Sequence, residues 1–178
     1  MTSTRLVFLA IVVAGVVLDL WTKDAAFRAI AESPNKKEIV VVEGFFHLYE
    51  MRNPGMAWSL LQNVDRRVWI VVRGVLSLVL LTVYWTRPRM PWWANVAFAF
   101  VIAGAIGNLY DNVFAELGRV RDFILLIFWG KRFPVFNIAD SMITIGAPLL
   151  LVFFADAKPT GAGQPPAGEK PPAERSPA

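Results

Sequence analysis

The sequence predicts an all-α membrane protein, with four transmembrane helices and a small β-rich cradle outside the membrane. Of its 178 residues, 56% are apolar, and they come in long blocks. Four blocks approach the roughly 20 residues that a helix needs to cross a bilayer core. A polar stretch between the first two blocks, residues 24–67, contains a piece rich in Val, Phe and Tyr. These observations favour a membrane bundle with a surface sheet over a soluble domain.

The apolar blocks predict one domain over residues 1–155, with spans at about residues 6–23, 68–85, 92–109 and 137–155. The first block also has the basic start and apolar run of a signal peptide, but no small-residue cleavage site follows it. Asp19, Trp21 and Lys23 follow instead. We therefore interpret this block as a retained transmembrane helix.

The connections between the spans differ in composition. Residues 39–51, within the long first connection, favour strands and a small sheet on the membrane surface. Residues 110–136 join the third and fourth spans, and the apolar piece 123–129 within them is too short to cross a bilayer. We expect this piece to dip into the membrane interface or to pack under the polar site described below. The tail, residues 156–178, is rich in proline and is predicted to be disordered.

The net charge is +4, but Lys and Arg are scattered among loops and span ends. This pattern favours membrane lipids over nucleic acid as partners. Under the positive-inside rule, the Lys and Arg residues near the span ends give opposing indications of the orientation in the membrane. A cytoplasmic N-terminus is favoured by Arg5, Arg87 and Arg89, and the opposite orientation by Arg66, Arg67, Lys131 and Arg132.

The chain has no cysteine and one histidine, His47. Disulfides, thiolate metal sites and cysteine nucleophiles are therefore excluded, and a single imidazole argues against a His-rich zinc site. We interpret His47 as a structural or interfacial residue, and we predict neither a metal nor a cofactor.

Polar residues concentrate where the predicted topology brings span ends together. In an antiparallel bundle, the end of the first span, the end of the third and the start of the fourth lie at one membrane face. These places carry Asp19, Lys23, Asn108, Asp111, Asn137 and Asp140. An ionisable group in a span costs about 3 kcal/mol, so it usually has a partner or a function. The loops that carry Asn53 and Asp122 emerge on the same face.

The spacing of these residues indicates different roles. Asp19 and Lys23 are four residues apart with the acid first, which predicts a structural ion pair. Asn108 and Asp111 share one helix face, and we expect a hydrogen-bonding support and an ion-pair or capping residue. Arg73 can extend toward the same interface, either as an anchor or as a substrate contact.

Asp140 follows Asn137 by three positions, so both side chains lie on the same helix face, and no Lys or Arg adjacent in its own helix neutralises it. An unpaired acid of this kind favours a functional role for Asp140. Asp122, beside Arg121, is by itself typical of a solvated loop. Two carboxylates near a dry interface can share one proton. The ionised member then activates water while the protonated one donates to an amide carbonyl, so such a pair can hydrolyse peptides.

Five motifs resemble, in the same order, those of the lipoprotein signal peptidase family, also called signal peptidase II. The resemblance covers roughly residues 5–155. The motifs are DLWTK at 19–23, NPGMAWS at 53–59, GAIGNLYD at 104–111, VRDF at 120–123 and FNIADS at 136–141.

The resemblance implies an aspartic endopeptidase whose catalytic dyad is Asp122 and Asp140. It implies that the substrate or the dyad is held by Asn53, Gly55, Asn108, Asp111 and Asn137. It also implies that Asp19 and Lys23 support the fold near the site.

The resemblance further implies the substrate and the location. The family removes the signal peptide of a diacylglyceryl-modified prolipoprotein, cleaving before the lipidated cysteine, and is inhibited by globomycin. The expected location is the bacterial inner membrane, with both termini cytoplasmic and the site at the periplasmic face. We expect a monomer.

One position departs from the family pattern. The family usually has Arg directly after the aspartate that matches Asp111, whereas this chain has Asn112. Arg119 or Arg121 is the expected replacement for that cation.

Two other functions fit part of the pattern. Intramembrane Asp and Asn residues also make proton relays, as in a small proton-coupled transporter or a channel component. A relay should cross the bilayer, however, whereas these carboxylates gather at one face. A purely structural membrane protein would not need unpaired acids.

Overall fold

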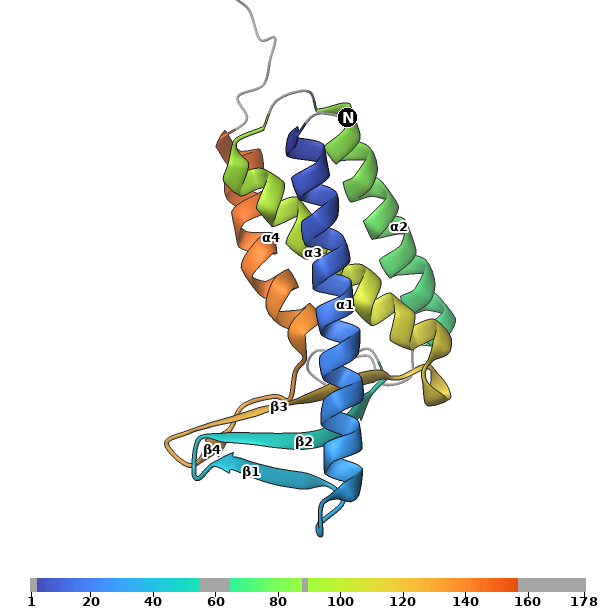
Figure 1. The fold of residues 1–178 in the computed structure, drawn as a ribbon. Coiled ribbons are helices and arrows are strands. Elements are labelled where there is room, and N and C mark those ends of the chain that lie inside the picture. The colour runs from blue at the N-terminus through green and yellow to red at the C-terminus, as the bar shows by residue number, and fades with distance from the viewer. Residues whose placement is uncertain (1–2, 55–64, 88–89, 157–178) are drawn as a thin grey trace, which may run out of the picture.

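The computed structural model describes residues 3–54, 65–87 and 90–156. In those ranges it has the helices α1 (Ser3–Glu32), α2 (Arg66–Thr86), α3 (Trp92–Phe114) and α4 (Ile138–Asp156). All four are long and apolar enough to cross a membrane, as the sequence predicts. They lie side by side, with a sheet at the end of the bundle away from the N-terminus (Figure 1).

Helix α3 forms the centre of the bundle. Of its most apolar window, 67% is buried, against 28% for α1, 11% for α2 and 22% for α4. The core around it includes Phe8, Tyr84, Phe98 and Leu150, and the rings of Phe8 and Tyr84 stack at 3.7 Å. The outer helices leave large apolar side chains exposed. These are the surfaces that lipid covers in a membrane bundle, whose helices associate through tight packing.

Two glycines allow α3 to approach its neighbours closely. A Cβ added at Gly104 would lie 2.4 Å from the backbone oxygen of Ala139 on α4, and one at Gly107 would lie 2.5 Å from Oδ2 of Asp19 on α1. Real Cβ atoms do not approach other atoms so closely, so both positions require glycine. The close packing brings the polar ends of three helices together.

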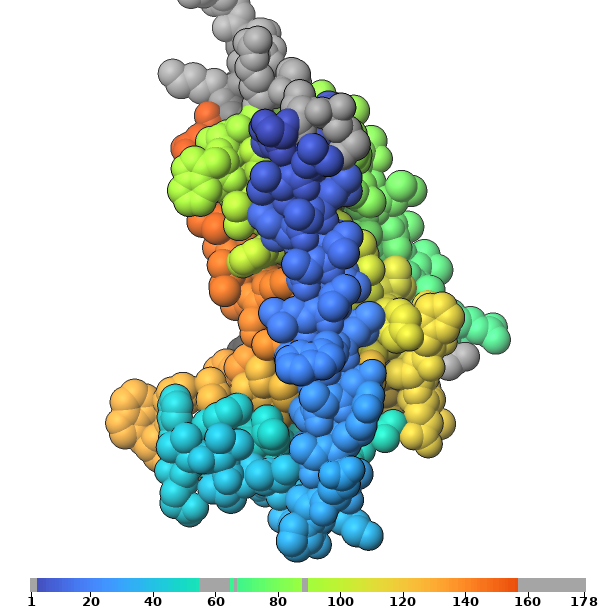
Figure 2. All heavy atoms as spheres, viewed as in Figure 1, coloured from blue at the N-terminus to red at the C-terminus, as the bar shows by residue number. Residues whose placement is uncertain are grey.

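The sheet is antiparallel, in the order β1 (Glu38–Val42), β2 (Phe46–Asn53), β3 (Val120–Phe128) and β4 (Lys131–Arg132). The first hairpin confirms the small sheet predicted for residues 39–51. His47 lies in β2, and its Nδ1 is 2.5 Å from Oε1 of Glu38 on β1. The hydrogen bond from His47 lowers the pKa of Glu38. In Figure 2 the sheet projects to one side beyond the helical bundle.

The structure differs from the sequence-based expectation in two elements. The first span was expected to end at Lys23, but α1 continues to Glu32, because Ala26 and Ile30 extend a buried stripe that packs on the sheet side. The apolar piece 123–129 was expected to dip into the interface or pack under the site. Most of it forms the strand β3, which the sequence did not indicate, and β2 is its antiparallel partner.

Candidate active site

The predicted polar residues gather where the bundle meets the sheet. Six of them are at most 2% exposed: Asp19, Lys23, Asn108, Asp111, Asp122 and Asn137. Asp140 and Asn53 are half-buried beside them. Gly55, the remaining predicted site residue, lies outside the described residues. The structure therefore brings together residues from α1, α3, α4 and two strands.

The two candidate catalytic carboxylates are each held by amide side chains. Asp122 lies on β3, where its Oδ1 accepts a hydrogen bond of 2.6 Å from Nδ2 of Asn137 and its Oδ2 accepts one of 2.9 Å from Nδ2 of Asn53. Asp140 lies in the first turn of α4, and its Oδ1 accepts a bond of 2.7 Å from Nδ2 of Asn108. These bonds restrict the rotation of both carboxyl groups.

Asn137 links the two carboxylates through the start of α4. Its Oδ1 accepts a hydrogen bond of 2.8 Å from the backbone N–H of Asp140, as a helix-capping side chain does. Its Nδ2 also lies 3.1 Å from Oδ1 of Asn108. The same amide thus caps the helix that carries one carboxylate and hydrogen-bonds the other.

A buried ion-pair network lies beside this arrangement. The Nζ of Lys23 lies 2.7 Å from Oδ2 of Asp19, 3.1 Å from Oδ2 of Asp111 and 3.1 Å from Oδ1 of Asn108. Asp19 in turn accepts a bond of 2.8 Å from the backbone N–H of Ala139. The predicted ion pair of Asp19 and Lys23 is present, and it ties α1 to α3 and α4.

Arg121 neutralises the other side of Asp111. Its backbone N–H, Nε and Nη2 donate to the Asp111 carboxylate at 3.0, 3.0 and 2.8 Å, and its Nη1 donates to Asp24. Successive side chains of a strand point to opposite faces, so Arg121 faces these acids while Asp122 faces Asn137. Arg121 is therefore occupied, and Arg119, the other expected replacement cation, is exposed.

The cation that contacts Asn112 comes from α2, which sequence reasoning did not foresee. Nη1 of Arg73 donates to Oδ1 of Asn112. The sequence indicates that Arg73 can reach this interface, but no pattern in it pairs the two residues. Asn112 is fully buried.

Burial and charge change the acidity of Asp122. Burial raises its pKa most, the charge of Asp140 raises it further, and the bonds from Asn53 and Asn137 lower it in part, which leaves a pKa of about 7. A carboxyl group with this pKa, beside a second carboxylate, has the properties of a general acid.

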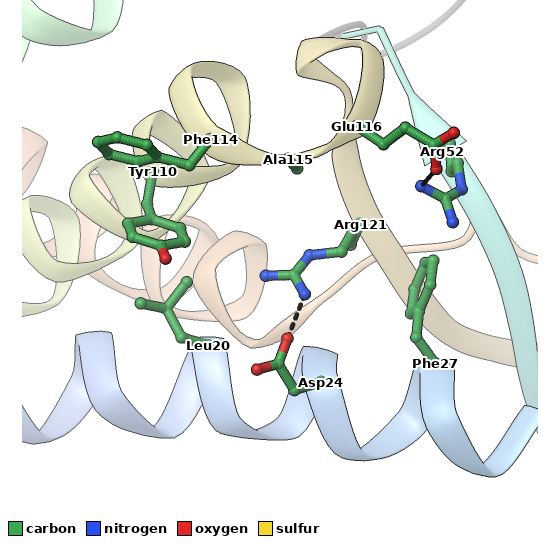
Figure 3. Close-up of a pocket in the computed structure, with 9 residues that line it drawn as sticks. All are labelled: Leu20, Asp24, Phe27, Arg52, Tyr110, Phe114, Ala115, Glu116 and Arg121. Carbon is green, nitrogen blue, oxygen red and sulfur yellow. Dashed lines mark hydrogen bonds and ion pairs between the residues drawn. The ribbon is translucent and has the colours of Figure 1, made fainter.

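A pocket of about 360 Å³ adjoins the site on the Arg121 side. Figure 3 shows the guanidinium of Arg121 extending to Asp24 on α1, and the ion pair of Arg52 and Glu116 at one edge. Neither candidate carboxylate lines this pocket. Within the described ranges, no three His, Asp or Glu side chains form a group that could hold a metal.

Comparison with known proteins gives consistent matches. The family model described as signal peptidase (SPase) II matches residues 11–155. The chain is 33% identical over 153 residues to the lipoprotein signal peptidase of Enterococcus faecalis, covering 86% of this chain and 90% of that protein. It is 39% identical over 130 residues to that of Pseudomonas fluorescens, covering 70% of this chain and 75% of that protein.

Solved structures agree with this match. A bacterial membrane enzyme superposes with a TM-score of 0.71 at 28% sequence identity, over 89% of this chain and 94% of that one. A second structure of a bacterial membrane enzyme gives a TM-score of 0.70 at 29% identity, over 85% and 94%.

Proposed function

The chain belongs to the signal peptidase II family, and we propose that Asp122 and Asp140 are the catalytic pair of its peptidase activity. As a member of that family, the protein removes signal peptides from prolipoproteins. The main support for assigning these two residues as the catalytic pair is the set of asparagine side chains that hydrogen-bond them. Asn137 hydrogen-bonds Asp122 and caps the helix turn that holds Asp140.

In the proposed mechanism, Asp122 carries the proton and Asp140 acts as the base. The pKa of Asp122, about 7, lets it hold a proton near neutral pH. Asp140 takes a proton from water, the resulting hydroxide attacks the scissile carbonyl carbon, and Asp122 protonates the carbonyl oxygen. The proton held by Asp140 then passes to the nitrogen of the tetrahedral intermediate, and the C–N bond breaks as the neutral amine leaves. As the carbonyl re-forms, Asp122 recovers its own proton from the hydroxyl group.

The substrate proposed for this site is a prolipoprotein that already carries diacylglycerol, cleaved before the lipidated cysteine. Two features support it. The outer helices expose large apolar surfaces to lipid, for example at Val13 and Leu151, and the site lies where these helices end. A diacylglyceryl group can therefore lie among the spans while the peptide lies under the sheet. Globomycin as an inhibitor and a monomeric state belong to the same proposal.

We also propose that the protein lies in the bacterial inner membrane with its site at the periplasmic face. The sheet and the N-terminus lie at opposite ends of the bundle (Figure 1). Arg5 lies at the end away from the sheet, 4.6 Å from the ring of Trp85, and Arg87 follows the end of α2 there. By the positive-inside rule these arginines support a cytoplasmic position for that end, against Arg67, Lys131 and Arg132 on the sheet side. The loops 24–67 and 110–136 are then periplasmic, and the tail, most of which lies outside the described residues, is cytoplasmic.

The proposal is tested by Asp122→Asn and Asp140→Asn, each purified and incubated with a diacylglyceryl-modified prolipoprotein. We expect both variants to lose cleavage, measured as a gel shift, while their thermal unfolding shows a folded protein. Wild-type cleavage should be blocked by globomycin.

The matched control is Asp156→Asn, which changes an exposed aspartate at the far end of α4 and should cleave at the wild-type rate. Turnover retained by either site variant would reject the catalytic pair.

A further inference from the structure

Arg73 is a cation within an apolar helix that faces the site. It lies on α2 and is half-buried, and its Nη1 donates to Oδ1 of Asn112 on α3. Asn112 is fully buried, and its Nδ2 donates a bond of 3.0 Å to the backbone oxygen of Gly118. That second bond fixes the orientation of the Asn112 amide. Its oxygen is therefore a rigid acceptor that holds the guanidinium in place.

The other buried cations near the catalytic pair are occupied. An ammonium group has three N–H donors, and Nζ of Lys23 has three oxygen neighbours within 3.1 Å, on Asp19, Asp111 and Asn108. Arg121 is bound by Asp111 and Asp24. Neither cation can turn toward a substrate without breaking a buried ion pair.

Arg73 differs because, among the described residues, most of its donors have no hydrogen-bond partner. A guanidinium has five N–H donors. Among the described residues, the bond to Asn112 is the one hydrogen bond that this guanidinium makes. Its charge nevertheless interacts with those of Asp140, Asp122 and Asp111. The N–H groups that have no partner among the described residues thus lie within electrostatic reach of the proposed catalytic pair, and no acid of the described ranges forms an ion pair with them.

We propose that Arg73, held by Asn112, binds the backbone carbonyl oxygens of the substrate next to the scissile bond. This inference rests on the proposed function. An N–H donor from a charged group bonds a carbonyl more strongly than a neutral donor does, and the interaction strengthens further if negative charge develops on the oxygen. Arg73 would then position the peptide between Asp122 and Asp140 from the α2 side.

The test compares Arg73→Gln, Arg73→Lys and Arg67→Gln in steady-state cleavage of a diacylglyceryl-modified prolipoprotein. Losing a hydrogen bond from a charged donor should lower kcat/KM roughly 10-fold to 100-fold in Arg73→Gln. Arg73→Lys keeps the charge and should recover part of this loss. Arg67 is an exposed arginine on the same helix, so Arg67→Gln should match the wild type.

A double-mutant cycle with Asn112→Ala tests the positioning role. If Asn112 acts through Arg73, the losses in kcat/KM of Arg73→Gln and Asn112→Ala should not add in the double variant. Additive losses would reject the positioning by Asn112. Unchanged kcat and KM in Arg73→Gln, or a fall in melting temperature without any kinetic change, would reject substrate binding by Arg73.

The same assay separates failure of this inference from failure of the proposed function. If the wild type cleaves, the Asp122→Asn and Asp140→Asn variants do not, and Arg73→Gln is fully active, the inference on Arg73 fails alone. Activity in the aspartate variants would instead reject the catalytic pair on which the inference rests.

Discussion

Nδ2 of Asn137 donates a 2.6 Å hydrogen bond to Oδ1 of Asp122, and both residues are completely buried. This bond joins the start of α4 to β3, two elements that are separated in the chain by β4 and residues 133–137. The oxygen of the same amide accepts the backbone N–H of Asp140. Asn137 is therefore the one side chain that hydrogen-bonds both members of the proposed catalytic pair, while Asn53 and Asn108 each hold one of them.

Replacing that side chain should therefore impair catalysis. Asn137→Ala removes a hydrogen bond to a carboxyl group and the cap of α4. A hydrogen bond to the protonated Asp122 carboxyl contributes about 0.5–1.5 kcal/mol and a helix cap about 1 kcal/mol, so kcat should fall roughly 10-fold. Cleavage of a prolipoprotein substrate under saturating conditions measures this.

The control for Asn137→Ala is Asn95→Ala. Asn95 is also buried, but it lies at the other end of α3, where Nδ2 donates to the backbone oxygens of Met90 and Pro91. This control should lose stability and retain kcat. Full activity of Asn137→Ala would show that the pair keeps its geometry without this amide.

The pKa of Asp122 predicts how activity depends on pH. Since the pKa is about 7, the proposed acid loses its proton as the pH rises through this value. The value of kcat/KM, which reports ionisations of the free enzyme, should fall about tenfold per pH unit on the alkaline side. Initial rates at low substrate concentration between about pH 5 and 9 measure it. A flat profile through this range would contradict Asp122 as the proton donor.

The same pKa predicts an effect on stability. The unfolded chain ionises Asp122 near 3.8, whereas the folded protein ionises it near 7. Between these values the folded state holds a proton that the unfolded state has lost, so the contribution of this proton to stability falls as pH rises through the window. The melting temperature of the wild type relative to Asp122→Asn should decline over the same window. An increase would contradict the raised pKa.

The buried lysine predicts a large stability effect. Lys23→Met leaves the carboxylates of Asp19 and Asp111 without their shared cation. Removing one partner of a buried ion pair costs about 3–5 kcal/mol, so we expect a marked fall in melting temperature and in the yield of folded protein.

Arg28→Met is the comparison for Lys23→Met. Arg28 pairs with Asp24 at 3.8 Å, but its side chain is 77% exposed, and exposed pairs contribute about 0–1 kcal/mol. If both variants unfolded at the same temperature, the Lys23 network would not stabilise the fold.

The sequence alone predicted the parts of this site that depend on local spacing and span topology. The four-residue spacing of Asp19 and Lys23 predicted their ion pair, and antiparallel spans predicted that the polar ends of three helices meet. Both rules need only the length and direction of the helices.

The remaining parts depend on tertiary pairing, which one sequence does not reveal. Residue by residue, Asp122 is typical of a solvated loop. It is buried because β3 pairs with β2 and contacts α1 and α3. The bonds of Arg121 to Asp111 and of Arg73 to Asn112 join residues on different elements. No local spacing connects these pairs, so the sequence alone does not point to Arg73 as the partner of Asn112.

The last prediction concerns the close approach of α1 and α3. Gly107→Ala would place a methyl group 2.5 Å from Oδ2 of Asp19, so α1 or the Asp19 carboxylate must move. Overpacking of this kind typically costs about 1–3 kcal/mol, and the melting temperature should fall.

Gly74→Ala is the matched control, since an added Cβ there would meet no atom of another element within 4 Å among the described residues. Alanine favours a helix over glycine by about 1 kcal/mol, so the control should melt at the wild-type temperature or slightly higher. Because Oδ1 of Asp19 also accepts the backbone N–H of Ala139, moving this carboxylate disturbs the start of α4 and should lower kcat as well. Equal melting temperatures for the two variants would show that α1 can yield at this contact without cost.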